Sequence, residues 1–425
     1  MKPPSRSVLR VSKNAFARLA AQVWAKLLSI ALVALVARYE TAESLGRYVL
    51  VLTIVAIAGA LADLGLNTFL TREVARETDN EGWRDLLGTT LLLKVSLSLV
   101  GLAGLVVVAA LQIFPPATSP LIAVGGLLLL PEAMVGTMRA FVNARQRMEV
   151  SGLIDMTIRL IAVAGSWPAL SAGFGVAGVI LCTVGATWLG ALLYGAILLR
   201  WRAIPSWSWS VRRWLSYLQE SYPFALTSIV AMVYARIDLL LLGLWQGELA
   251  AGWYGAAYKL WEALGLLPAS LLEALFPEMS RLSSSPQGLQ SLRRLFRRGS
   301  PWMLAGGLLL ATGGILVAGP LLSLVYGGNG EYAPAVAPLR LLLLATPAMF
   351  LYLLSGHVLY ALGQQRRVTV AMVIVGGLNI VLNLIVIPRW SFLGAAAVAL
   401  ASEWLLLVLV YPQAYRALDR QGGRS

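Results

Sequence analysis

The chain is a succession of apolar runs, each long enough to cross a lipid bilayer as a helix. A spanning helix needs about 20 apolar residues, and such runs recur from residue 19 to residue 415 with short polar connections between them. The runs are rich in Leu, Ala and Val and do not alternate, which favours helices over barrel strands. Because 58% of the residues are hydrophobic and only 13% charged, a water-soluble globule is excluded. The twelve predicted spans are 19–37, 48–70, 86–111, 120–142, 152–172, 175–199, 217–244, 250–277, 301–325, 335–361, 368–387 and 392–415.

The basic residues predict the orientation of these spans. Most of the 34 Lys and Arg lie at the N-terminus or in even-numbered connections, and the opposite face carries only Arg38, Arg47 and Arg389. Because Lys and Arg are enriched in cytoplasmic loops, both termini are expected in the cytoplasm. The basic N-terminus has no small-residue cleavage site after its apolar run, so we expect a retained first helix. The net charge of +14 therefore reports topology, and no folded basic domain suggests nucleic-acid binding.

Weak sequence similarity between the two halves predicts an internal repeat. Short segments that open spans two and six and follow span four recur about 206 to 219 residues later. Each half has an even number of spans, so the repeat is parallel. The sequence therefore predicts an all-α integral membrane protein of twelve helices in two six-helix lobes. The lobes are related by a pseudo-two-fold axis along the membrane normal and enclose a central cleft. The paired segments are Glu43–Tyr48 with Glu248–Tyr254, Phe174–Gly178 with residues 392–396, and Ala144–Arg147 with Leu362–Arg367.

Two polar segments define the domain boundaries. The Trp-rich segment 204–216 is expected to lie in the headgroup region and to join an N-terminal lobe, 1–203, to a C-terminal lobe, 217–425. Residues 285–299 carry one apolar stripe and four arginines after a capping serine, Ser284 or Ser285, and we expect a short in-plane cytoplasmic helix there. An ordinary basic loop that enforces topology explains the same arginines.

The scarcity of reactive residues limits the chemistry of the chain. Cys182 and His357 are the only cysteine and histidine, which excludes a disulfide within the chain, a Cys or His metal site and Ser-His-Asp catalysis. A membrane glycan-processing enzyme, such as a polymerase or ligase, needs catalytic residues in a large outer loop, and the longest outer connection, near 326–334, is only about nine residues long, which disfavours this alternative. We therefore expect a protein that is not an enzyme and that needs no cofactor.

Four stretches of the sequence carry a resemblance to a known family: 13–38 with Gly46–Tyr48, Ala62–Leu66 with Thr71–Glu73, Arg236–Gly243 with Gly252–Lys259, and Asn379–Arg389 with 394–399. They resemble the polysaccharide repeat-unit flippases (Wzx type) of the multidrug/oligosaccharidyl-lipid/polysaccharide exporter superfamily. The resemblance extends over nearly the whole chain through the order and spacing of these stretches. It implies a multi-pass protein of the bacterial cytoplasmic (inner) membrane that turns an undecaprenyl-pyrophosphate-linked oligosaccharide to the outer leaflet for O-antigen or exopolysaccharide assembly. It also implies membrane lipids and a glycan polymerase complex as partners.

Three intramembrane cations are candidates for binding the pyrophosphate. Lys26, Arg236 and Lys259 lie near mid-depth of their spans, and a diphosphate needs several positive donors to replace its hydration in a low-dielectric site. Lys26 and Arg236 lie on equivalent spans and could face each other across the cleft. Arg340, nearer the outer end of span ten, is a weaker candidate that snorkelling explains equally well. In the alternative interpretation, Arg236 pairs with Asp238 or Glu262, and Lys259 pairs with Glu262.

Other polar residues within the spans have coupling or structural roles. Asp63, Glu132 and Glu403 have no local partner, so each is a candidate for carrying a coupling proton or cation, or for hydrogen-bonding a helix end. Lys94 and Arg139 are expected to snorkel, Asp155 to pair with Arg159, Asn379 and Asn383 to bond between helices, and Pro268 and Pro347 to bend their helices.

The nearest rival function is a multidrug cation antiporter of the same superfamily. Such a protein needs an acidic binding cavity, whereas the three mid-depth candidates here are cations. Sugar stacking on Tyr and Trp side chains of the cleft is compatible with the flippase interpretation, but the pattern does not select individual residues.

Overall fold

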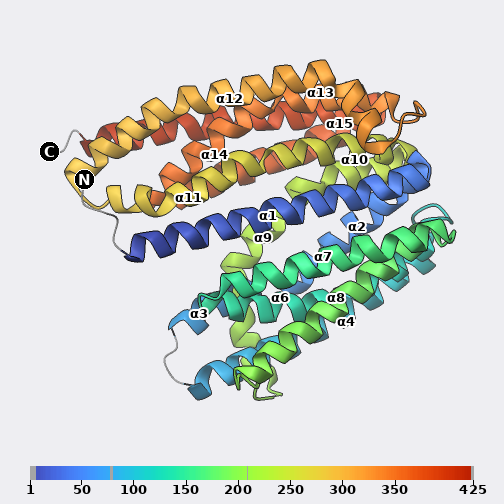
Figure 1. Ribbon diagram of the computed structural model, residues 1–425, viewed down its shortest axis with the longest axis horizontal. Helices are drawn as coiled ribbons and strands as arrows, with labels where there is room; N and C mark the ends of the chain where they lie inside the picture. The colour runs from blue at the N-terminus through green and yellow to red at the C-terminus, as the bar shows by residue number, and fades with distance from the viewer. Residues whose placement is uncertain (1–5, 77–79, 208, 423–425) are drawn as a thin grey trace. The chain divides into compact units, whose positions relative to one another are not determined.

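The twelve predicted spans all lie on helices. The computed structural model describes residues 6–76, 80–207 and 209–422, and every regular element among them is helical (Figure 1). Ten helical stretches in this part of the chain are long and apolar enough to cross a membrane. One of them, within α15 (Gln365–Gly422), is bent at Ser391 and holds two spans, and α1 (Arg6–Tyr39) holds the first. The prediction of an all-α, twelve-span membrane fold is therefore confirmed.

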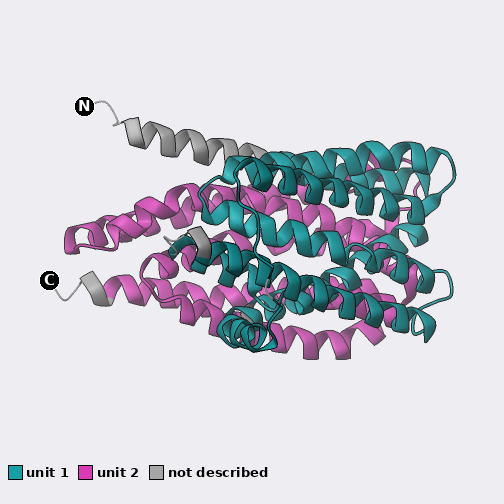
Figure 2. Cartoon of the chain, turned by 90° about the horizontal axis from the view of Figure 1, so that it is seen from below, with its two compact units in different colours: residues 1–236 teal, residues 237–425 magenta. Residues whose placement is uncertain are grey.

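The described residues form two compact units, 1–236 and 237–425 (Figure 2). The division falls within α9 (Val211–Trp245). The lobe boundary drawn from the sequence at 204–216 stays a prediction. The first unit also holds α1, α2 (Ala42–Asp63), α3 (Leu66–Arg76), α4 (Asn80–Ala110), α5 (Ser119–Gly126), α6 (Leu129–Ala144), α7 (Met148–Ser171) and α8 (Gly175–Arg200). The second also holds α10 (Gly247–Leu264), α11 (Leu266–Leu282), α12 (Pro286–Tyr326), the 3-10 turn η1 (Ala333–Ala335), α13 (Val336–Leu344), α14 (Thr346–Ala361) and α15.

Both units contain a broken second and a broken fourth span. In the first unit, Leu64 and Gly65 have left-handed φ values of 44° and 75° and separate α2 from α3. The fourth span breaks at Leu128, where α5 gives way to α6. In the second unit, the breaks fall at Gly265 and Ala345, in the corresponding spans. This shared pattern supports the internal repeat.

Prolines account for three of these four breaks. Pro131, Pro268 and Pro347 each follow a break by two or three residues. Proline has no N–H, so it cannot close the bond to the carbonyl four residues earlier, and its ring crowds that carbonyl. Near two of the breaks the chain tightens into three-residue bonds, as from Leu128 N to Gly125 O and from Ala345 N to Leu342 O, both 3.0 Å. The expected bends at Pro268 and Pro347 are thus present.

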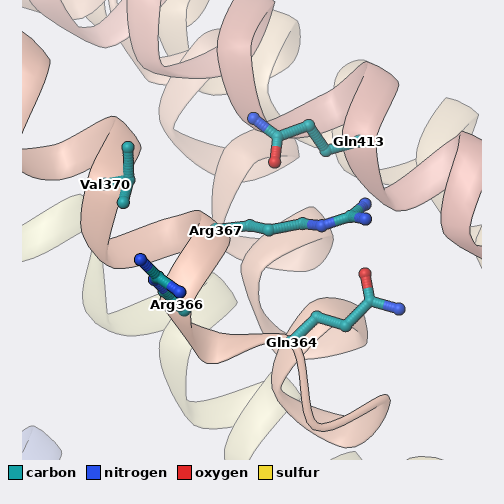
Figure 3. Close-up of a pocket in the computed structure, with 5 residues that line it drawn as sticks. All are labelled: Gln364, Arg366, Arg367, Val370 and Gln413. Atoms are coloured by element: carbon teal, nitrogen blue, oxygen red, sulfur yellow. The ribbon is translucent and has the colours of Figure 1, made fainter.

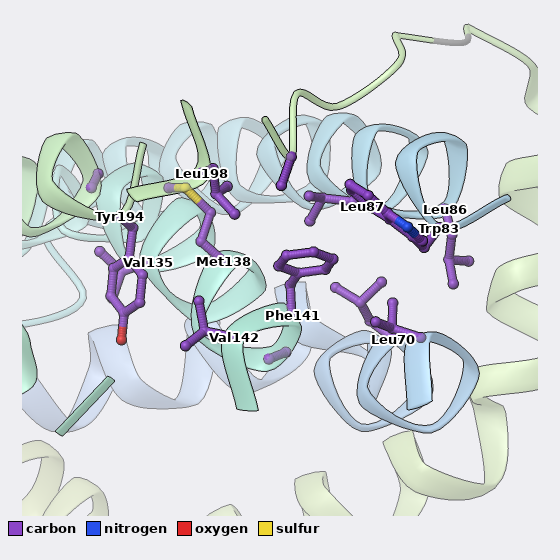
Figure 4. Packing of buried hydrophobic residues seen from close by; sticks show 14 of the residues in the cluster. Leu70, Trp83, Leu86, Leu87, Val135, Met138, Phe141, Val142, Tyr194 and Leu198 are labelled. Atoms are coloured by element: carbon purple, nitrogen blue, oxygen red, sulfur yellow. The ribbon is translucent and has the colours of Figure 1, made fainter. Parts of the chain in front are cut away.

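A buried apolar cluster holds the first unit together at one end. Phe141 of α6 is 1% exposed and its ring lies 5.1 Å from that of Trp83 of α4 (Figure 4). Arg145, at the end of α6, stacks its guanidinium on both rings, at 5.0 Å from Trp83 and 5.6 Å from Phe141. Leu70 of α3 and Tyr194 of α8 complete the contact of four helices. The cluster holds α3 and α6 in place, and each of these helices directly follows one of the breaks.

The expected separate in-plane helix near 285–299 is wrong. Residues 286–299 are the first turns of α12, which continues through the ninth span without a break. Ser285 caps it, as expected, because its Oγ accepts from Gly288 N at 3.2 Å. The apolar stripe packs inward instead of on a membrane surface: Phe296 is fully buried and its ring lies 5.3 Å from Tyr411 of α15. An ion pair of 2.6 Å between Arg293 and Asp419 strengthens this contact.

Candidate functional site

The break in the second span positions a buried ion pair in the first unit. Asp63 ends α2 and Asn67 lies in the first turn of α3, so the two side chains flank the break. Lys94 of α4 reaches both, with its Nζ 2.7 Å from Asp63 Oδ1 and 2.8 Å from Asn67 Oδ1. A Cβ added to Gly136 of α6 would lie 3.3 Å from this Nζ, so the ammonium sits against the backbone of a third helix.

This ion pair corrects two expectations. Lys94 does not snorkel, since only 4% of its side chain is exposed, and Asp63 has a partner. The local spacing could not reveal the pair because its members are far apart in sequence. A buried charge in a low-dielectric surrounding is retained only with a partner, so the pair locks α4 to the broken span.

A second ion pair joins the fourth and fifth spans. Arg139 Nε of α6 lies 3.2 Å from Asp155 Oδ1 of α7, and the Tyr194 hydroxyl interacts with both side chains. Asp155 therefore does not pair with Arg159, which is exposed, and Arg139 does not snorkel. Glu132 is exposed about two turns before Arg139 on α6 and acts on it, and on Lys94, through charge. The candidate coupling carboxylates Asp63 and Glu132 thus belong to one polar region of the first unit.

In the second unit, Lys259 and Glu262 form the pair that the alternative interpretation predicts. Lys259 Nζ lies 3.4 Å from Glu262 Oε2, one turn before the break at Gly265. The two side chains are 20% and 29% exposed, so neither is sealed from solvent. In each unit, therefore, a lysine binds an acid at the end of the helix that precedes the break.

Asp238 is held by a tyrosine. The Tyr254 hydroxyl of α10 donates to Asp238 Oδ2, and the Leu239 backbone N–H donates to Oδ1 at 2.8 Å. Asp238 is 6% exposed. Its carboxylate thus fixes the end of α9 to α10. The pairing of Arg236 with Asp238 or Glu262 in the alternative interpretation stays a prediction.

Aromatic side chains also follow one another along two turns of α10. The Tyr258 ring lies 5.7 Å from Tyr254 and 5.5 Å from Trp261. Tyr352 of α14 lies within electrostatic range of Tyr258 and of Glu403. Tyr258 and Lys259 are consecutive on α10, so their side chains leave the helix in different directions. The sequence pattern did not single out these tyrosines, since aromatic residues at helical spacing are common in apolar cores.

Of the two asparagines of the eleventh span, Asn379 bonds to another span as expected, whereas the bond that Asn383 donates stays within the span. Asn383 Nδ2 donates to Asn379 Oδ1 at 3.0 Å, and Asn379 Nδ2 donates to Ser402 Oγ at 2.9 Å. Ser402 lies beyond the bend at Ser391, so the chain of bonds links the eleventh and twelfth spans. Glu403, the next residue, is 6% exposed.

The remaining predicted cations are distributed over both units. Lys26 on α1 and Arg236 on α9 are half-buried, and both belong to the first unit. Lys259 and Arg340 belong to the second, where Arg340 of α13 is exposed. The role of these four side chains in binding a pyrophosphate stays a prediction.

Comparison with known proteins identifies the family of the chain. Residues 11–283 match the family described as "Polysaccharide biosynthesis protein", and residues 223–385 match the MatE family. The probable flippase AglR of Haloferax volcanii is 29% identical over 221 residues, a stretch that covers 51% of this chain and 44% of that protein. The chain thus matches less than half the length of this curated relative.

Solved structures share the fold at low sequence identity. Lipid II flippase MurJ, in an inward closed conformation, has a TM-score of 0.72 and 14% identity, with 95% of this chain and 89% of that chain covered. An inward-facing MATE family multidrug resistance transporter has a TM-score of 0.70 and 14% identity, with coverage of 97% and 99%. A transporter of the MOP superfamily from Pyrococcus furiosus has a TM-score of 0.63 and 13% identity, with coverage of 97% and 96%. The chain therefore belongs to the polysaccharide biosynthesis protein family, the polysaccharide flippases of the multidrug/oligosaccharidyl-lipid/polysaccharide exporter superfamily.

Proposed function

We propose that the protein moves an undecaprenyl-pyrophosphate-linked oligosaccharide repeat unit from the cytoplasmic to the outer leaflet of the bacterial inner membrane. The observation that carries this proposal is the family match over residues 11–283. The similarity to a probable flippase over half of the chain supports it. The repeat unit then serves assembly of a cell-surface polysaccharide such as an O-antigen or an exopolysaccharide. The protein transports its substrate without changing it, so it is not an enzyme.

The proposed substrate has two polar parts, and side chains suited to each are found within the spans. Lys26, Arg236 and Lys259 supply positive charge for the pyrophosphate, which needs several donors once its hydration is lost. Tyr258 and Trp261, on the same helix as Lys259, offer apolar ring faces that suit the C–H faces of sugar rings. The Lys259 and Glu262 side chains are 20% and 29% exposed, so the ammonium is partly accessible to an anion.

Alternating access requires helices that bend at fixed points. The breaks at Leu64–Gly65 and at Gly265 occur in corresponding spans of the two units, and so do those at Leu128 and Ala345. We propose that these breaks absorb the change in helix direction during transport.

Asp63, Glu132 and Glu403 are proposed to carry a coupling proton or cation. If they do, flipping stops when the membrane potential and ion gradients are collapsed, and flipping that persists argues against coupling.

Gene deletion tests the substrate directly. In a deletion strain, one lipid-linked oligosaccharide should accumulate on the inner leaflet, where mass spectrometry identifies its glycan and its lipid carrier. Expression of the wild-type chain should remove the accumulated species and restore surface glycan. A strain that accumulates no such lipid, with its surface glycan unchanged, would exclude the proposed substrate.

A multidrug cation antiporter is the second candidate, favoured by the MatE match over residues 223–385. Purified protein that binds an organic cation such as ethidium, with binding unaffected by Gln at positions 26, 236 and 259, would support this function. The flippase proposal expects no saturable ethidium binding.

A further inference from the structure

A cavity of about 520 Å³ opens at one end of the second unit, where α14 turns into α15. Its wall is formed by Gln364, Arg366, Arg367, Val370 and Gln413 (Figure 3). The bend at Ser391 reverses the direction of α15 and lies at nearly equal sequence distances from Arg367 and Gln413. The bend therefore returns the end of the twelfth span to the start of the eleventh. This turn follows span ten, so the sequence places it on the cytoplasmic side.

The polar groups of the cavity suit an anion. Arg367 extends between the amides of Gln364 and Gln413 (Figure 3). Arg366 and Arg367 are both exposed, and neither forms an ion pair with a described carboxylate. Gln364 Oε1 is buried with no hydrogen-bond partner among the described residues, so this amide is not fully engaged. The cavity wall thus carries two guanidinium groups and two amides, all of which have N–H donors.

The equivalent turn of the first unit shows that folding does not require these arginines. There, Gln146 has a left-handed φ of 56°, and Val150 N bonds to Arg147 O at 3.0 Å. In the second unit, Gly363 has a φ of 70°, and Arg367 N bonds to Gln364 O at 3.0 Å.

The matched bonds align Glu149 with Arg366 and Val150 with Arg367. Arg147 of the first unit pairs with Glu149 at 3.5 Å. Val150 is partly buried and packs against the apolar cluster. The second unit thus replaces an acid and an apolar residue by two cations, although the turn is closed by the same bonds.

An apolar surface begins at the cavity and follows the helix away from it. Val370, which lines the cavity, is 48% exposed, and Val373 and Ile374, one turn further along, are 45% and 54% exposed. The spacing of three and four residues continues through Leu378 and Val381, which are 42% and 51% exposed. A ligand that fits both features carries a phosphate and an attached hydrocarbon chain.

We propose that this cavity binds the phosphate of an anionic phospholipid headgroup, with the acyl chains lying along the exposed apolar face of α15. Basic pockets between spanning helices on the cytoplasmic side suit such headgroups. Arginine rather than lysine fits the role because its planar fork donates two parallel bonds to phosphate oxygens. The positive-inside rule explains basic charge at this end of the helix, but it does not require a cavity or a guanidinium group.

Lipid titration of the purified full-length protein tests the proposal. The protein is titrated with phosphatidylglycerol or with phosphatidylcholine in detergent, and bound lipids are counted by native mass spectrometry. Arg366→Gln/Arg367→Gln should weaken the tightest phosphatidylglycerol site about tenfold. Arg366→Lys/Arg367→Lys retains the charge and therefore membrane topology, and should weaken it about threefold. The matched control, Arg294→Gln/Arg298→Gln, removes the same charge from exposed positions on α12 and should change the affinity less than twofold.

The outcomes separate a specific lipid site from its alternatives. Loss in both Arg366/Arg367 variants, with the control unaffected and phosphatidylcholine bound weakly, supports the site. Equal loss in the control double variant would mean that only bulk charge matters and would overturn the proposal. Displacement of phosphatidylglycerol by soluble glycerol 3-phosphate or inorganic phosphate at millimolar concentration would identify a soluble phosphate as the ligand and overturn the lipid assignment. The lysine variant keeps the charge that sets membrane topology, so weaker lipid binding by this variant does not come from altered insertion. None of these results depends on which substrate the protein transports.

Discussion

Lys94 Nζ of α4 lies 2.7 Å from Asp63 Oδ1, directly before the break that separates α2 from α3. Lys94 is almost fully buried, whereas the exposed fraction of the Asp63 side chain is 21%. The second span therefore changes direction at a point where its last carboxylate is bound to a neighbouring helix. Any rearrangement at this break must either carry α4 along or break the pair.

Replacing Lys94 by Met should destabilise the first unit. The substitution leaves Asp63 without its ammonium partner, and removal of one member of a buried pair costs about 3 kcal/mol or more. Thermal unfolding in detergent measures the change. Asp63→Asn combined with Lys94→Met should restore much of the loss because no uncompensated charge remains. The exposed pair is the control: Arg147→Gln should cost at most about 1 kcal/mol, since both partners are more than half exposed.

Gly65→Ala should be among the most damaging small substitutions in the chain. Gly65 has a φ of 75°, and an added Cβ would lie 2.5 Å from Ala225 N and 2.8 Å from Phe224 Cβ. The left-handed backbone alone costs about 1 kcal/mol, and the contact with backbone atoms adds to this. We expect a lower melting temperature and reduced yield of folded protein.

Gly185→Ala is the matched comparison for Gly65. Gly185 lies inside α8 with nothing within 4 Å of an added Cβ, and an alanine in a helix is favoured over glycine by about 0.5 to 1 kcal/mol. Equal stability of the two alanine variants would contradict the account of the break.

Asn379→Leu should weaken the contact between the eleventh and twelfth spans. The variant loses the bond to Ser402 Oγ and leaves Asn383 without its acceptor, and hydrogen bonds of this kind between spans contribute about 0.6 to 2 kcal/mol. The melting temperatures of Asn379→Leu, Ser402→Ala and the double variant form a thermodynamic cycle. Additive losses in this cycle would show that the two side chains do not interact.

Neutral replacement of the three candidate cations should abolish glycan export. Lys26→Gln/Arg236→Gln/Lys259→Gln removes the charge proposed for the pyrophosphate without removing the breaks that allow bending. Surface glycan is measured in a deletion strain that expresses the triple variant, with membrane levels matched to wild type. Arg294→Gln/Arg298→Gln, at exposed positions on α12, should export normally. Intact export by the triple variant would exclude the proposed role of these cations.

Apolar run length and proline position predict most of this fold. All twelve spans, the bends near Pro268 and Pro347 and the cap at Ser285 follow from residues close in sequence, because helices are stabilised by local bonds. The Lys259–Glu262 pair, one turn apart on the same helix, is visible for the same reason.

Pairs between helices were not predictable from local spacing. Asp155 has Arg159 at the favoured spacing of four residues, yet it binds Arg139 of another helix. The apolar run that begins at residue 86 places Lys94 near the membrane surface, whereas α4 begins earlier, at Asn80. The prediction of a separate helix at 285–299 is wrong because its apolar stripe, which includes Leu292 and Phe296, is buried against α15 and not on a membrane surface. These outcomes depend on the packing of distant segments.

Reconstitution tests the central claim most directly. Purified protein in proteoliposomes is supplied with an undecaprenyl-pyrophosphate oligosaccharide in one leaflet, and a glycan-degrading enzyme added outside reports the fraction that has crossed. The account predicts that wild-type protein exposes substrate to the enzyme, while empty vesicles and the Lys26→Gln/Arg236→Gln/Lys259→Gln variant retain it. Folded wild-type protein that moves no lipid-linked oligosaccharide but takes up an organic cation would contradict the account. That result would identify a drug antiporter instead.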